Sequence, residues 1–250
     1  AYPPGSFRRL ARDLYVSSPE LCFLQMAPSL PFGRLVLLGM ELCGGYALDP
    51  DSLEGFRRRE PLSSAAALRR TTRRLAGVKG AKAARFAVRF VADGALSPME
   101  AAVVLLLCAP TSRGGYGLEL PVLNAEVRLT RPAGCWPASR LCDLYWPDRR
   151  LAIEYDSNRF HVGAERIARD AARRAQLARE GVEVLTLTWD QVRHAGRFHE
   201  VAVLVAMRLR GGFRCSRSDW EARRAELRRQ VLPGRDAGCR SSLAFSASSG

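Results

Sequence analysis

The chain has 250 residues, of which 47% are hydrophobic and 26% charged, as expected for a globular protein with one large or two small domains. No apolar run reaches the ~20 residues that a membrane helix needs, and no signal-peptide pattern opens the chain, so we expect a cytoplasmic protein with no membrane partner. The net charge of +14 comes almost entirely from arginine and favours nucleic acid as a polyanionic partner.

The cysteine and histidine pattern argues against a zinc site. Seven cysteines are scattered without a Cys-x-x-Cys pair, and none of the three histidines stands at zinc-ligand spacing. We therefore predict buried free thiols in a reducing compartment.

Residues 1–95 are predicted to form a mostly helical, basic module of unknown function. Ser18 and Pro19 have the capping and first-turn chemistry of a helix start. Further helices are expected over 31–42, 63–75 and 81–92. The helix over 63–75 carries four candidate nucleic-acid contacts, Arg69, Arg70, Arg73 and Arg74. A charged run is also typical of a solvated helix face, so both interpretations stay open.

A glycine turn, Gly77–Gly80, connects the last two of these helices. Such turns in DNA-binding helical hairpins give backbone N–H groups to a phosphate, but the glycine spacing here departs from that motif. A plain helical connection is therefore the favoured interpretation.

Residues 96–210 alternate between helix and strand patterns. The expected order is α, β, β, β, α, β, α over 97–108, 124–130, 137–146, 151–155, 164–180, 182–188 and 189–210. This order predicts an α/β fold, a mixed sheet flanked by helices. Residues 211–250 are expected to give a short basic helix over 220–231 and a disordered tail.

Two of the predicted strands form a hairpin that brings carboxylates together. If the chain turns at 147–150, Asp143 lies across from Glu154 on the same face, with Asp156 two residues further along. Opposed like charges destabilise a sheet, and acidic residues are disfavoured in strands. A divalent cation between the carboxylates would explain their placement.

The sequence around this hairpin resembles the Vsr-like branch of the PD-(D/E)XK nucleases. The resemblance covers about residues 97–193, and its motifs are Glu154 to His161, Asp170-Ala-Ala-Arg173, Leu177 to Gly181 and Val184 to Trp189. It implies a restriction-endonuclease-like fold with an αβββαβ core. It also implies hydrolysis of DNA with Mg²⁺ or Mn²⁺ held by Asp143 and Glu154. Many domains of this branch stand at the C-terminus of AbiEi-type abortive-infection antitoxin proteins.

The resemblance assigns roles to further residues, each with a structural alternative. Glu100 would reach the metal site, although Ser97 and Glu100 also form a capping box. Asp156 stands where the family-wide pattern has lysine, so the charge that lysine brings to the phosphate is missing. His161 would act as general acid or base.

The helix over 164–180 is the expected contact to the scissile phosphate. Arg173, Arg174 and Gln176 are its candidate nucleic-acid-binding residues. Pairing of Asp170 with either arginine one turn later explains the same pattern structurally.

The sequence thus predicts a metal-dependent DNA endonuclease, acting in phage defence or DNA processing. The alternative is a DNA-binding regulator of the toxin–antitoxin type, whose nuclease fold has lost catalysis. The aspartate at 156 and the antitoxin setting of related domains favour that alternative.

Overall fold

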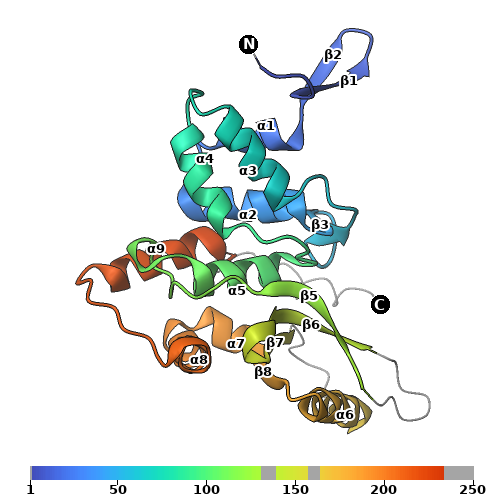
Figure 1. Ribbon diagram of the computed structural model, residues 1–250, viewed down its shortest axis with the longest axis vertical. Helices are drawn as coiled ribbons and strands as arrows, with labels where there is room; N and C mark the ends of the chain where they lie inside the picture. Colours follow the sequence, from blue (N-terminus) through green and yellow to red (C-terminus); the bar gives the residue numbers. More distant parts are fainter. Residues whose placement is uncertain (1, 131–138, 157–163, 234–250) are drawn as a thin grey trace, which may run out of the picture.

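The computed structural model describes residues 2–130, 139–156 and 164–233. Its elements are arranged along one long axis (Figure 1). Short hairpins and helices from the first part of the chain occupy one end, and a four-stranded sheet with its helices occupies the other.

Two short antiparallel hairpins lie among the helices of the first part. β1 (Phe7–Ala11) pairs with β2 (Leu14–Ser17), and β3 (Tyr46–Leu48) pairs with β4 (Phe56–Arg58). The prediction of a mostly helical module is therefore wrong for these segments. Aromatic and branched residues around polar turns favour pairing here, and Tyr46 packs edge-on against Phe56 with ring centroids 6.2 Å apart.

The helices of this part begin close to the predicted capping residues. They are α1 (Pro19–Met26), α2 (Phe32–Cys43), α3 (Ala65–Arg74) and α4 (Ala81–Ala87), the last continued by the 3-10 turn η1 (Val88–Phe90). The Ser18 hydroxyl accepts the N–H of Leu21 at 3.3 Å. Between α3 and α4, Gly80 has φ +88, and a Cβ there would lie 2.7 Å from the Pro28 ring. Packing against Pro28 thus accounts for this glycine.

The predicted order of helices and strands after residue 96 is confirmed. The elements are α5 (Pro98–Cys108), β5 (Val122–Arg128), β6 (Ser139–Trp146), β7 (Leu151–Asp156), α6 (Ala164–Arg179) and β8 (Glu183–Thr188). The strands lie side by side in the order β5-β6-β7-β8. The first two pairings are antiparallel and the third is parallel, so the sheet is mixed.

The turn between β6 and β7 has the predicted position. Pro147–Arg149 forms the 3-10 turn η3, and Arg150 adopts a left-handed conformation with φ +46. The ladder then pairs Trp146 with Leu151 and Leu144 with Ile153. This is the register that the turn position predicts.

The single helix expected over 189–210 is two helices. α7 (Trp189–Arg193) and α8 (Ala195–Arg210) are separated by His194, whose φ and ψ of −96° and 117° are extended. Thr188 and Gln191 form a capping box that starts α7 right after β8. A second helix then starts after the extended residue His194.

The sheet is covered on both faces. The main core contains α5, the facing residues Leu144 and Ile153 of the sheet, and the helices of the first part. A second cluster, under α6, consists of Val127, Cys142, Ala152, Leu177 and Val182. Within the part of the chain that the structure describes, no helix is long and apolar enough to cross a membrane.

The helix predicted over 220–231 is present as α9 (Trp220–Val231) and belongs to the main core. The indole N–H of Trp220 donates to the Gly115 carbonyl at 3.1 Å, next to the 3-10 turn η2 (Thr111–Arg113). At the other end, the Gln230 side chain accepts the N–H of Gly33 at 2.8 Å. Helix α9 thereby ties the first part of the chain to α5. The predicted disordered tail lies outside the described residues.

Candidate active site on the β6–β7 hairpin

Asp143 lies where the strand ladder is interrupted on both of its sides. On the β5 side the paired residues are Leu123 with Leu144 and Ala125 with Cys142, so the skipped position sets Asn124 against Asp143. On the β7 side pairing stops at Leu144 and Ile153, one step before Glu154. The backbone ladder therefore opens in the row that contains Asn124, Asp143 and Glu154.

At this opening, the Asp143 carboxylate accepts a hydrogen bond from a backbone N–H of the neighbouring strand. Its Oδ2 accepts the N–H of Tyr155 at 2.8 Å, across the hairpin. Burial raises the pKa of Asp143, while this hydrogen bond and the positive charge of Arg173 oppose the rise. Asp143 is thus a half-buried carboxylate held between two strands.

Glu154 is paired with a cation from α6. The Nη2 atom of Arg173 lies 2.9 Å from Glu154 Oε1, and the two side chains are 34% and 19% exposed. The same guanidinium donates to the Leu141 carbonyl of β6. Leu177, one turn further along α6, is fully buried against the sheet, and this places Arg173 on the sheet-facing side of the helix. Arg173 therefore joins α6 to both strands of the hairpin.

One cation serves both carboxylates of the hairpin. Arg173 contacts Glu154, and its positive charge opposes the rise that burial causes in the pKa of Asp143. The same charges affect the neighbouring thiol of Cys142. Burial raises the pKa of Cys142 to about 11, and the negative charges of Glu154 and Asp143 add to this rise. The like-charge repulsion that the sequence suggested is thus relieved by a side chain of the protein.

Glu100 caps α5 and also adjoins the hairpin. Its Oε1 accepts the Ser97 hydroxyl at 2.8 Å and its Oε2 accepts the Leu96 N–H at 2.9 Å, while Ser97 accepts the Glu100 N–H at 3.2 Å. The side chain is 7% exposed. Burial raises the pKa of Glu100, and the charge of Asp143 adds to the rise against those hydrogen bonds. Ser97 thus caps α5 as predicted, but the capping box is incomplete, because the Glu100 carboxylate accepts the N–H of Leu96 and not that of Ser97.

Asn124 is a site residue that the sequence analysis missed. Its Nδ2 donates to Glu100 Oε2 at 2.7 Å and to the Gly94 carbonyl at 2.9 Å. Its φ of +48 is unusual for a residue within a strand. The available signal was an asparagine, the residue that best tolerates this conformation, at the start of a predicted strand.

The other predicted catalytic residues are placed only in part. Asp156 ends β7 and pairs with Thr188 of β8 in the parallel ladder. His161 lies outside the described residues. No group of three or more His, Cys, Asp or Glu side chains that could hold a metal ion occurs within residues 2–130, 139–156 and 164–233.

The predicted nucleic-acid contacts fall into two separate places. On α6, Arg174 is exposed, and the Gln176 side chain accepts the Arg140 Nε–H at 2.8 Å. On α3, Arg70, Arg73 and Arg74 are exposed and Arg69 is half-buried. Helices α3 and α6 lie toward opposite ends of the long axis (Figure 1), so these arginines do not form one patch with Arg173.

Two relatives resemble part of this chain. They are uncharacterised proteins of Mycobacterium tuberculosis, MT2308 of strain CDC 1551 / Oshkosh and Rv2248 of strain ATCC 25618 / H37Rv, each 32% identical over 117 residues. The matched stretch is 47% of this chain and 39% of each relative, so the match spans about two fifths of their length. No family model and no solved structure matches the chain.

Proposed function

We propose that this chain is a metal-dependent DNA endonuclease with a restriction-endonuclease-like core, acting in phage defence or DNA processing. The observation that carries the proposal is the row of Asn124, Asp143 and Glu154 across an opened strand ladder. Acidic residues and missing backbone hydrogen bonds are both unfavourable within a sheet, and such unfavourable features tend to occur at functional sites. The resemblance to the Vsr-like PD-(D/E)XK family, whose motifs here include Glu154, implies that the same two carboxylates hold the metal.

The donor set fits a hard divalent cation. Mg²⁺ is commonly held by one or two carboxylates, with waters and substrate phosphates completing its shell, and Asp143 and Glu154 would supply that pair. The ion pair of Arg173 with Glu154 shows that this carboxylate accepts a positive charge, which supports the proposal. When bound, Mg²⁺ or Mn²⁺ would activate water and neutralise charge on the phosphate.

Arg173 would have two positions in this scheme. Held by Glu154 and Leu141, it balances the carboxylates. Once released from Glu154, it would bring a bidentate donor to the phosphate, the task that lysine performs in the resembling family and that Asp156 cannot. His161 would exchange the proton with water or the leaving oxygen.

The decisive experiment is nicking of supercoiled plasmid by the purified chain in Mg²⁺ or Mn²⁺. The substitution Asp143→Asn should abolish cleavage but leave DNA affinity equal or higher, because a negative charge facing phosphate is removed. Asp148→Asn, in the exposed turn of the same hairpin, is the matched control and should cut like the parent. Cleavage by the Asp143→Asn variant at the parent rate would sink the proposal.

A second candidate has its own observation in favour. Arg173 already neutralises Glu154, and Asp156 replaces the expected lysine, as in a nuclease fold that binds DNA without cutting it. A regulator of this kind should prefer one operator over random duplex by ~10³-fold or more. Such a preference, together with an absence of metal-dependent nicking, would favour the regulator.

A further inference from the structure

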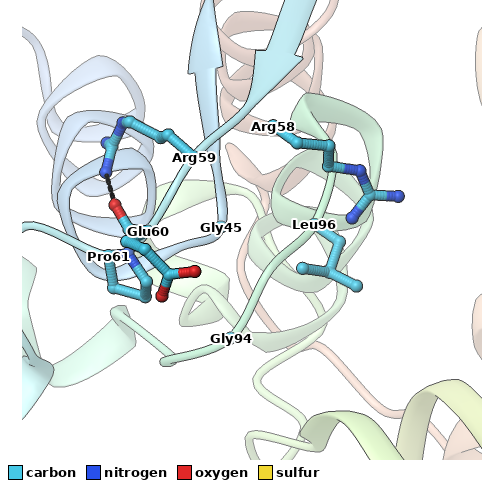
Figure 2. Close-up of a pocket in the computed structure, with 7 residues that line it drawn as sticks. All are labelled: Gly45, Arg58, Arg59, Glu60, Pro61, Gly94 and Leu96. Carbon is cyan, nitrogen blue, oxygen red and sulfur yellow. Dashed lines mark hydrogen bonds between the residues drawn. The ribbon is translucent and has the colours of Figure 1, made fainter.

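An open cavity of about 600 Å³ lies between the β3–β4 hairpin and the segment that leads into α5. It is lined by Gly45, Arg58, Arg59, Glu60, Pro61, Gly94 and Leu96. Figure 2 shows Arg58 and Leu96 on one side of it, Arg59, Glu60 and Pro61 on the other, and the two glycines between them. Its size is that of a small-ligand site, in the usual range of ~300–1,000 Å³.

The cavity presents one anchored and one exposed guanidinium. Arg59 is fixed by donating to the carbonyls of Glu60, at 2.8 Å, and Glu41 (Figure 2). Arg58 is exposed and lies opposite Tyr46 in the hairpin. Because side chains alternate along a strand, Arg57 points to the other face, where it meets Asp49 at 3.6 Å. Arg58 and Arg59, the latter just past the end of β4, line the cavity from its two sides, whereas Arg57 does not line it.

The cavity wall needs glycine where the two segments meet. The Gly45 N–H donates to the Ala95 carbonyl at 2.8 Å, and the Gly45 carbonyl accepts the Arg59 N–H at 3.1 Å. A Cβ on Gly45 would lie 2.7 Å from Leu96 Cδ2. This close approach places the apolar Leu96 side chain on the same side of the cavity as Arg58 (Figure 2).

The same wall is hydrogen-bonded to the candidate active site. The Gly94 carbonyl accepts from Asn124, and the Leu96 N–H donates to Glu100. Asn124 lies opposite Asp143 in the strand register, and the charge of Asp143 helps to raise the pKa of Glu100. Residues 94–96 thus have the cavity on one side and the acidic cluster, the carboxylates of Glu100 and Asp143, on the other.

We propose that this cavity binds one nucleotide of a single-stranded nucleic acid, a more distant phosphodiester of which would reach the carboxylates. Arg58 would bind the phosphate, while Arg59 would add positive charge from the opposite wall. Leu96 would pack on the sugar or base, and Glu60 would accept a base N–H. The mixture of cations, a carboxylate and an apolar wall suits a nucleotide better than a bare anion. The inference rests on the proposed nucleic-acid substrate but not on cleavage.

The test is equilibrium binding of a short fluorescent oligothymidylate to the full chain in EDTA, where hydrolysis cannot contribute. Arg58→Ala should weaken binding fivefold or more and reduce the log–log salt slope by about 0.7, the value for one phosphate contact on a single strand. Arg57→Ala, the neighbour on the opposite face, should leave both unchanged. Thermal unfolding of both variants checks that their folds are equal.

Competition separates a nucleotide site from an anion site. Thymidine monophosphate should displace the oligonucleotide from the parent at lower concentration than inorganic phosphate does, and Arg58→Ala should remove that difference. Equal losses from Arg57→Ala and Arg58→Ala, no loss from Arg58→Ala, or equal competition by phosphate would each overturn the inference. If only the plasmid assay fails, the proposed cleavage is wrong, but the proposal that the cavity binds a nucleotide is unaffected.

Discussion

At the scale of single residues, the candidate site depends on how buried carboxylates are compensated. Asp143 has a backbone N–H, Glu154 has Arg173, and Glu100 has hydrogen bonds from Ser97, Leu96 and Asn124. Each partner offsets part of the cost of burying a charge. Substitutions at these positions should therefore change ion affinity and pH dependence before they change the fold.

Arg173→Ala should raise affinity for Mn²⁺ about tenfold, roughly 1.4 kcal/mol, because a competing cation leaves Glu154 and Asp143. The measurement is titration calorimetry of the free protein, without DNA. Arg174→Ala, the exposed neighbour, should have no effect. Equal or weaker Mn²⁺ binding by Arg173→Ala would mean that Arg173 does not occupy the cation's place. If neither the parent nor the variant binds Mn²⁺, the metal proposal itself fails.

Glu100→Gln should stabilise the protein more as the pH rises. Burial raises the pKa of Glu100 in the folded state, so this group's contribution to stability is greatest below its unfolded pKa and is lost as pH rises through its folded pKa. A glutamine does not titrate and keeps an oxygen for Leu96. The free energy of unfolding of the variant relative to the parent should grow with pH, by about 1.4 kcal/mol per unit of pKa difference. A relative stability that falls with pH would contradict the assignment.

At the scale of elements, the sequence predicted what local patterns specify. The order of helices and strands after residue 96, the β6–β7 register and the bounds of α9 follow from alternation, turn residues and capping residues. The sequence analysis missed the short hairpins β1–β2 and β3–β4, whose few residues give little periodicity. It also missed the break at His194, whose extended backbone separates α7 from α8.

The sequence predicted the contacts of the candidate site that lie within one hairpin, but not those between residues far apart along the chain. Asp143 and Glu154 lie on one hairpin, so a turn position was enough to oppose them. The bonds from Asn124 to Gly94 and Glu100 join residues 24 to 30 positions apart, and no pattern in the sequence specifies them. The ion pair of Arg173 with Glu154 also joins residues far apart in the sequence, and the sequence offered only Asp170, one turn away, as a structural partner for this arginine.

Helix α9 depends on one glycine for its contact with η2. Gly114 has φ +89, and a Cβ there would lie 2.3 Å from the Arg223 carbonyl oxygen. Gly114→Ala combines backbone strain with overlap and should cost about 3 kcal/mol or more. Gly211→Ala, at φ +79 with nothing within 4 Å, should cost only the strain, about 1–2 kcal/mol. Denaturant unfolding of both variants measures the difference, and equal losses would show that the overlap is relieved.

At the scale of the whole molecule, one core joins the parts that the sequence divided at residues 95 and 210. Buried residues from Leu21 in α1 to Val231 in α9 belong to a single cluster that includes α5 and the sheet residue Ile153. The described part of the chain should therefore unfold in one transition. Far-ultraviolet circular dichroism and tryptophan fluorescence, which includes Trp146 and Trp220, should give the same midpoint. Two separated transitions would mean that the first 95 residues are an independent domain.

The short segment from Gly94 to Glu100 has a consequence for the products. It links the cavity wall to the acidic cluster through hydrogen bonds on both sides, so a nucleotide held by Arg58 would lie at a fixed distance from the carboxylates. A single strand anchored by its end in the cavity would then be cut a constant number of nucleotides from that end. End-labelled oligonucleotides of different lengths should yield one common short fragment. With Arg58→Ala, the labelled fragments should instead have many different lengths.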